Sequence, residues 1–402
     1  MRVRINKQIH GDRITEKCGR SFQSRERSEE ERAVAVDLIP LTPLRSVRGS
    51  VSVCSSIRFG SKLICQMTTS YCWILDSGGA GRGAWQGGVI YEFMRWCREN
   101  GTFPSITMGA SAGGYAAADV ATGTEKTVMK GWSYWGTGTS RALASQNSRF
   151  RAHLRSSISY VMEETEMAGV FDGNPERKLL VFTTRVRRQG RKPLGSTDRL
   201  RLFLKSATRK LPGPLKYLPK SYIEDPVIFA LNLPTELESE CVRPLTRRNY
   251  HAVIEASCLV PMAMGAPLLP EDLDQSLCPD DRDSVFVDGG YALKMPMRLF
   301  AEDSRFQALG NWVRADKTIV FCCDPKGCLW ETSARLHRLN TLPSVAKAIG
   351  ENRLLVIYPD HKVEAGFLCM DHAITMRTFH RGRDQAHRLL RSDQVRSFFG
   401  VR

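Results

Sequence analysis

Residues 106–114 of this 402-residue chain read Ile-Thr-Met-Gly-Ala-Ser-Ala-Gly-Gly. The strand-like residues before Gly109 and the Ala-rich, helix-prone segment from Ala112 to Val120 predict a strand that turns sharply into a helix. Gly-x-Ser-x-Gly at such a turn is the pattern of a nucleophile elbow, which needs small residues on both sides of the serine. It would lift the Ser111 hydroxyl beside helix N–H groups that favour developing negative charge.

A second strand-to-helix turn precedes this one. Residues 71–75, Tyr-Cys-Trp-Ile-Leu, form a continuous apolar run typical of a buried parallel strand. A glycine-rich turn at 77–83, a helix over 84–100 and a strand at 103–108 follow. This alternation predicts an α/β fold with a mostly parallel sheet and functional loops at the carboxyl ends of its strands.

Later elements are predicted from their apolar runs and periodicity. Strands are expected at 178–184, 284–287, 318–323 and 354–358, helices at 251–257 and 380–400, and a lid-like or connecting segment at 221–250.

The glycine-rich turn has two chemical interpretations beyond a tight structural turn. Its main-chain N–H groups can point into one cavity and bind an oxyanion or a phosphate. Residues 79–84 also fit the relaxed dinucleotide pattern G-x-G-x-x-G/A, which needs an acidic residue about 20 positions on, at the end of the next strand. Glu99 is the nearest, but it lies at the end of a helical pattern. A nucleotide-binding oxidoreductase therefore remains an alternative.

A carboxylate follows a third strand. Asp288 ends the run 284–287 and is followed by two glycines that can adopt open backbone angles. Together with Ser111 and the N–H donors of 78–83, it supplies the nucleophile, the base and the oxyanion donors that acyl transfer requires.

A triad-type serine esterase would need a histidine after the acid. The downstream candidates are His361, His372 and His380. However, the α/β-hydrolase fold places several strands before its elbow, and here only 71–75 clearly precedes it.

Four segments together resemble patatin-like phospholipases in order and rough spacing, over about residues 70–395. They are Ser-Gly-Gly-Ala-Gly-Arg-Gly-Ala-Trp-Gln at 77–86, Gly-Ala-Ser-Ala-Gly at 109–113, Ala-Ser-Cys-Leu-Val-Pro at 256–261 and Asp-Gly-Gly at 288–290. The resemblance implies a three-layer α/β/α sandwich with a mostly parallel central sheet. It also implies a lipid acyl hydrolase of phospholipase A type, with a Ser–Asp dyad and neither a metal nor an organic cofactor. A lipid-binding module without catalysis is a further alternative.

The resemblance assigns roles to single residues. Ser111 would be the nucleophile and Asp288 the base that takes its proton. The other assigned positions are the oxyanion-hole amides of Gly78, Gly79, Ala80 and Gly81, the loop supports Arg82 and Gly83, the elbow glycines Gly109 and Gly113, and the turn glycines Gly289 and Gly290. The chain departs from the family pattern at Ala80, where the loop's third glycine is expected, and at Leu293-Lys294, where Asp-Asn is common.

Charge is unevenly distributed along the chain, whose formal net charge is +16. Residues 1–66 hold 13 Lys/Arg and 7 Asp/Glu, a net charge of +6, and read as a disordered extension ahead of a catalytic domain at 67–402. Residues 185–220 hold 12 Lys/Arg against one acid. Within them, a basic amphipathic helix would either contact an anionic membrane or pack on the core; its basic positions are Arg199, Arg201, Lys205, Arg209 and Lys210. No nucleic-acid partner is expected.

The twelve cysteines form no regular framework, which indicates reduced thiols. Cys322, Cys323 and Cys328, with Cys369 and His372, contain no repeated C-x-x-C pair, so buried thiols are expected rather than a zinc site. The sequence shows neither a secretory signal nor a run of about 18 apolar residues. We therefore expect a cytoplasmic protein, with or without peripheral membrane contact.

Overall fold

The computed structural model describes residues 69–137, 147–188, 222–260, 267–273, 281, 283–333, 335, 337–366 and 369–401. These residues belong to the compact unit Cys54–Arg402. The expected extension at 1–66, the expected domain start at Met67 and the basic helix expected around 199–211 lie outside them.

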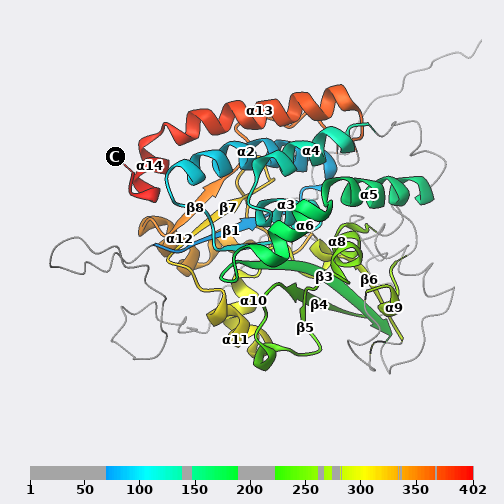
Figure 1. Cartoon of the computed structure of the whole chain (residues 1–402). Helices are drawn as coiled ribbons and strands as arrows, with labels where there is room; N and C mark the ends of the chain where they lie inside the picture. The colour runs from blue at the N-terminus through cyan, green and yellow to red at the C-terminus, as the bar shows by residue number, and fades with distance from the viewer. Residues whose placement is uncertain are drawn as a thin grey trace, which may run out of the picture. The chain divides into compact units, whose positions relative to one another are not determined.

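A central sheet holds the described strands in the order β5-β4-β3-β2-β1-β7-β8, with β6 also paired to β3 (Figure 1). The strands are β1 (Tyr71–Leu75), β2 (Ile106–Ala110), β3 (Lys178–Arg188), β4 (Tyr222–Ala230), β5 (Val242–Pro244), β6 (Ser284–Asp288), β7 (Lys317–Phe321) and β8 (Leu354–Ile357). The pairs are parallel except where β3 meets β4 and β6. The predicted mostly parallel α/β sheet is confirmed.

Helices cover both faces of this sheet. They are α2 (Gly79–Glu99), α3 (Ala112–Ala121), α4 (Glu125–Trp135), α5 (Asn147–Val161), α6 (Glu164–Ala168), α8 (Tyr250–Cys258), α9 (Pro270–Leu273), α10 (Met297–Glu302), α11 (Ser304–Trp312), α12 (Pro343–Gly350), α13 (His372–Leu390) and α14 (Asp393–Phe399). Figure 1 shows α2, α4 and α13 above the sheet, with α10 and α11 below it.

The apolar run of β1 explains this three-layer arrangement. Successive strand side chains point to opposite faces. Accordingly, Trp73 and Leu75 pack in the core cluster that contains residues of α2 and α13. Cys72 and Ile74 pack in the cluster that contains residues of α11 and α12. A strand buried on both sides must be apolar at every position, which is the pattern in the sequence.

The helix after β1 begins earlier than its sequence indicates. It was expected at 84–100, but α2 begins at Gly79, so most of the glycine-rich turn forms the first helical turns. Glycine destabilises a helix by about 1 kcal/mol per residue relative to alanine. The glycines are nevertheless found in α2 because neighbouring segments pack too closely for a larger residue. A methyl group at Gly83 would lie 2.6 Å from the indole ring of Trp132.

The segment 221–250 was wrongly expected to be a lid or connection, since it contains β4, β5 and the start of α8. Asp225 and Pro226 obscure the strand pattern of β4, which pairs antiparallel to β3 along its length. The reason for the charged residues is visible only in three dimensions, where Asp225 forms ion pairs with Arg185 and Arg187.

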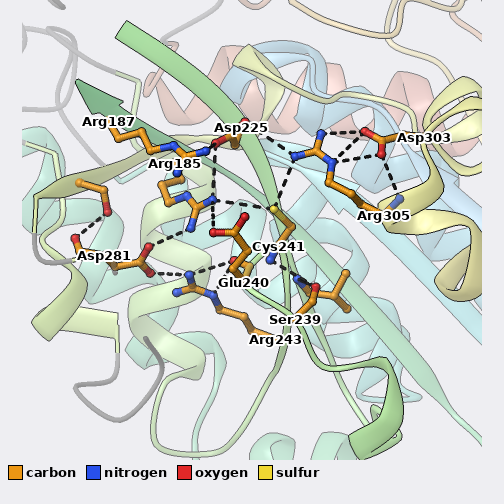
Figure 2. A network of polar contacts seen from close by, with 12 residues as sticks. Arg185, Arg187, Asp225, Ser239, Glu240, Cys241, Arg243, Asp281, Asp303 and Arg305 are labelled. Carbon is orange, nitrogen blue, oxygen red and sulfur yellow. Dashed lines mark hydrogen bonds and ion pairs between the residues drawn. The ribbon is translucent and has the colours of Figure 1, made fainter. Parts of the chain in front are cut away.

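Figure 2 shows the charged network to which these residues belong. The Arg185 side chain is only 1% exposed, and its guanidinium lies 2.9 Å from Asp281 Oδ1 and 3.4 Å from Asp225 Oδ2. Arg243, from β5, pairs with the other oxygen of Asp281. Removing one partner of a buried pair costs several kcal/mol. The network therefore fastens β4, β5 and the segment before β6 to β3, which fixes the strand that ends in Asp288.

The basic C-terminal helix expected at 380–400 is two helices, α13 and α14. The Ser392 hydroxyl accepts a hydrogen bond from the Val395 N–H at 3.4 Å and so caps the start of α14. Helix α13 packs along α2, where Trp85 Nε1 donates to Gln385 Oε1 at 2.9 Å. This contact helps to fix the helix whose first turn faces the candidate site.

Candidate active site

Ser111 is the single residue between the end of β2 and the start of α3. Its backbone angles are φ 56° and ψ −132°, which lie outside the regions that L-residues favour. Such strain persists only where the surrounding structure enforces it, and it is frequent at functional sites. The sharp strand-to-helix turn expected at this serine is therefore present.

The glycines on either side of Ser111 permit close backbone approach. A methyl group at Gly113 would lie 2.8 Å from the carbonyl oxygen of Asp76, at the end of β1. A methyl group at Gly109 would lie 2.9 Å from the backbone nitrogen of Gly114. Because backbone cannot yield as a side chain can, these positions accommodate no larger residue without moving the turn.

Two side chains at the end of α8 hold the backbone of Ser111. The Ser111 N–H donates to Ser257 Oγ at 3.0 Å, and that hydroxyl donates to the Phe182 carbonyl at 2.7 Å. The Cys258 thiol donates to the Ser111 carbonyl at 3.2 Å. Ser257 and Cys258 belong to the segment 256–261 that resembles the family, but the resemblance assigns them no role. Their contacts with the elbow could not be read from spacing.

Asp288 ends β6, which lies antiparallel to β3 with Asp288 opposite Thr183. In turn, Phe182 of β3 lies opposite Ala110, the residue before the elbow. Asp288 Oδ1 accepts a hydrogen bond from the Gly290 N–H at 2.8 Å. Its Oδ2 is buried and makes no hydrogen bond of good geometry within the described residues.

Burial raises the pKa of Asp288 from 3.8 to about 6. The Ser111 hydroxyl, the Gly290 N–H and the positive charge of Lys294 each act in the opposite direction, because they favour the carboxylate. The Ser111 hydroxyl is thus among the groups close enough to Asp288 to act on its pKa. A carboxylate with this pKa is ionised at neutral pH and accepts a proton readily.

The glycine-rich turn lies beside the elbow, because β1 and β2 are paired with Leu75 opposite Gly109. Gly78 caps α2 without any side-chain hydrogen bond, and no acidic residue lies in the first turn. Gly79 has φ 68°, a value that favours glycine. The first N–H groups of a helix have no intrahelical acceptor, so this end suits an anionic oxygen.

The neighbours of the glycine-rich turn keep it in place. A methyl group at Gly78 would lie 2.6 Å from Cys323 Sγ and 2.9 Å from Arg82 Cβ. A methyl group at Gly290 would lie 3.0 Å from the hydroxyl of Ser77. The Asp-Gly-Gly turn therefore lies close to the glycine-rich turn. The ends of β1, β2 and β6 thus come together at one site.

None of the three histidines considered for a catalytic triad, His361, His372 and His380, makes a polar contact with Ser111 or Asp288 in the described part of the chain. Within the described residues, no histidine forms a hydrogen bond or ion pair with Ser111 or Asp288. His361 contacts Asp360 at 2.5 Å, and His372 and His380 lie exposed on α13.

No cluster of three or more His, Cys, Asp and Glu suited to a metal ion occurs in the described part of the chain. Cys322, Cys323 and Cys328 are buried free thiols. Burial raises the pKa of the Cys322 and Cys323 thiols. None of the described helices has the length and apolar character to cross a membrane.

Comparison with known proteins agrees with this geometry. A family model described as Patatin-like phospholipase matches residues 74–301, more than half of the chain. The chain belongs to the patatin-like phospholipase family. The matched region of this patatin-like protein runs from β1 into α10 and so contains the glycine-rich turn, Ser111 and Asp288. A search of curated proteins gave no match. Membership supports a lipid acyl hydrolase and lipid substrates.

Proposed function

We propose that this patatin-like protein is a phospholipase A-type serine esterase that acts at a membrane surface through Ser111 and Asp288. One observation carries the proposal. A strained serine at a strand-to-helix turn lies near a buried carboxylate whose Oδ2 has no other hydrogen-bond partner among the described residues. This carboxylate can take a proton directly, so no histidine is required.

In the acylation step, Ser111 Oγ attacks the ester carbonyl carbon while its proton moves to Asp288 Oδ2. The carbonyl oxygen becomes an oxyanion that accepts hydrogen bonds from the amides of residues 78–81. The carbon–oxygen bond to the alcohol then breaks, and Asp288 returns the proton to the departing alkoxide. The products of this step are the free alcohol, a lysophospholipid for a phospholipid substrate, and an acyl group on Ser111.

The second step reverses these roles. Water donates a proton to Asp288 as its oxygen attacks the acyl carbon, and the same amides stabilise the second oxyanion. When this intermediate collapses, the proton returns to Ser111 Oγ and the carboxylic acid leaves. Each step regenerates the groups that the next one needs.

The test is fatty-acid release from phospholipid vesicles, compared with release from triacylglycerol emulsions. Ser111→Ala should abolish release, and Asp288→Asn should reduce it by about 10²–10⁴-fold, the usual contribution of a positioned base. His372→Ala should match the wild type, whereas a large loss would support the triad alternative. Full activity in Ser111→Ala would overturn the proposal. Specific nicotinamide or flavin binding without hydrolysis would favour the oxidoreductase.

Two further parts of the proposal concern residues outside the described ranges. We propose that the catalytic domain spans 67–402 and that the basic positions near 199–210 contact anionic lipid. Neutralising Arg201, Lys205 and Arg209 together should weaken binding to anionic vesicles at low salt. Unchanged binding would exclude this contact, and loss of activity in a protein that begins at Met67 would exclude the domain boundary.

A further inference from the structure

Lys294 follows the Asp-Gly-Gly turn and is largely buried, although lysine is rarely buried without a partner. Its side chain is 12% exposed, and its ammonium lies 2.8 Å from Asp76 Oδ1. Asp76 is 1% exposed.

Asp76 is held rigidly at the end of β1, directly before the glycine-rich turn. Its N–H donates to the Phe321 carbonyl at 3.1 Å. Its Oδ2 accepts the Cys323 N–H at 3.0 Å, and its carbonyl accepts the Gln86 side-chain amide at 3.2 Å. The carboxylate is therefore a fixed point to which Lys294 can attach.

The backbone around Lys294 is also fixed. The Lys294 N–H donates to the Glu331 carbonyl at 2.6 Å, and the Leu293 N–H donates to the Gly289 carbonyl at 2.9 Å. The ion pair consequently joins the two segments that carry the proposed base and the proposed oxyanion donors. These segments also lie close together, since a methyl group added at Gly290 would lie 3.0 Å from the Ser77 hydroxyl.

The charge of Lys294 acts on Asp288. Burial lowers the pKa of Lys294, but the charge and hydrogen bond of Asp76 outweigh this effect, so the pKa is raised and the ammonium persists. Among the described residues, the other groups that favour the Asp288 carboxylate are uncharged donors, the Ser111 hydroxyl and the Gly290 N–H. The neighbouring Cys258 thiol stays neutral, since burial raises its pKa well above its usual value. Lys294 is thus the cation that favours the Asp288 carboxylate.

We propose that Lys294 is a positioning residue for hydrolysis: its ion pair with Asp76 fastens the Asp-Gly-Gly turn to the glycine-rich turn and holds a fixed positive charge between the two turns. This inference rests on the proposed function. It goes beyond the Ser–Asp dyad, because it assigns a role to the ion pair between Lys294 and Asp76.

The test is the pH dependence of kcat/KM in the full-length protein. Lys294→Met removes the cation and leaves Asp76 unpaired, which should raise the pKa of Asp288. The acidic limb of the profile, where kcat/KM rises with pH as Asp288 ionises, should therefore shift to higher pH by roughly one unit. The double variant Lys294→Met/Asp76→Asn removes both charges and leaves no unpaired buried ion. Its limb should lie between those of Lys294→Met and the wild type, with kcat/KM reduced because the link between the turns is lost.

Lys178→Met is the matched control, since Lys178 is a partly buried lysine at the start of β3 that donates to the Trp312 carbonyl at 2.5 Å. It should leave the limb unchanged. If Lys294→Met fails to fold, the acidic limb of the double variant alone tests the inference. An acidic limb that matches the wild type in the folded variants would overturn the inference, because a purely structural role lowers activity without moving the limb. Failure of the proposed function is distinguishable, since hydrolysis would then persist in Ser111→Ala.

Discussion

The hydroxyl of Ser257 accepts the backbone N–H of Ser111 at 3.0 Å, so a side chain from α8 fixes the residue that the site depends on. Ser257 also donates to the Phe182 carbonyl of β3 at 2.7 Å. The same strand pairs with β6, which carries Asp288. One hydroxyl therefore connects the elbow to the strand that positions the proposed base.

Ser257→Ala leaves the buried Ser111 N–H without its acceptor, which should cost about 1–3 kcal/mol of unfolding free energy. Because the reacting oxygen would be less well placed, kcat/KM should fall by about tenfold or more. Ser392→Ala is the control, since it loses a partly buried hydrogen bond to the Leu389 carbonyl at 2.6 Å, between α13 and α14 and away from the elbow. Both variants should lose stability in urea unfolding, but only Ser257→Ala should lose kcat/KM. Equal kcat/KM in the two would contradict the role of Ser257.

Gly81→Ala should disrupt the glycine-rich turn. The added methyl group would lie 2.6 Å from the carbonyl carbon of Ala365 and closer still to the Gly366 carbonyl oxygen. Overpacking of this kind costs about 1–3 kcal/mol, and a displaced turn would misplace the oxyanion donors, so activity should drop more than tenfold. Gly366→Ala lies across the same contact but adds a methyl group that meets no described residue within 4 Å. It should stay near wild type in melting temperature and activity, and a similar loss in both variants would refute the steric argument.

Asp288→Asn should stabilise the protein at neutral pH while it inactivates it. Because burial raises the pKa of Asp288 from 3.8 to about 6, the folded state binds this proton more tightly than the unfolded state. Stability from this group is fully present below pH 3.8 and is lost as the pH rises through about 6. The shift of about two units corresponds to ~3 kcal/mol.

The expected gain of Asp288→Asn is therefore largest at pH 8 and disappears toward pH 4. Denaturant unfolding at several pH values measures it. A gain that is independent of pH, or a variant that is less stable than the wild type at pH 8, would contradict the raised pKa.

The sequence predicted those parts of the fold that local pattern determines. β1 was recognisable because a strand buried on both faces is apolar throughout, and the elbow because its turn demands glycines. The start of α2 was missed because Gly79 and Gly81 disfavour helix, and packing against distant backbone decides instead. β4 was missed because Asp225, whose partner is the buried Arg185, reads as a loop residue.

The candidate site likewise has features that local sequence predicts and contacts that it does not. That Ser111 and Asp288 each follow or end a strand was predictable from local pattern. Their proximity was not, because β6 runs antiparallel to β3 and pairs with the part of β3 beyond β2, so that Asp288, opposite Thr183, comes next to the end of β2. The contact of Ser257 with the elbow and the ion pair of Lys294 with Asp76 depend on the approach of segments far apart in the chain. No local pattern encodes such contacts.

The most direct test of the account is the pH dependence of fluorophosphonate labelling, with the modified residue mapped by peptide mass spectrometry. We predict a single adduct on Ser111, a labelling rate that is half-maximal near pH 6, the pKa of Asp288, and a rate reduced at least about 100-fold in Asp288→Asn. An adduct on another residue, or labelling of Asp288→Asn at the wild-type rate and with the same pH dependence, would contradict the proposal that Asp288 activates Ser111.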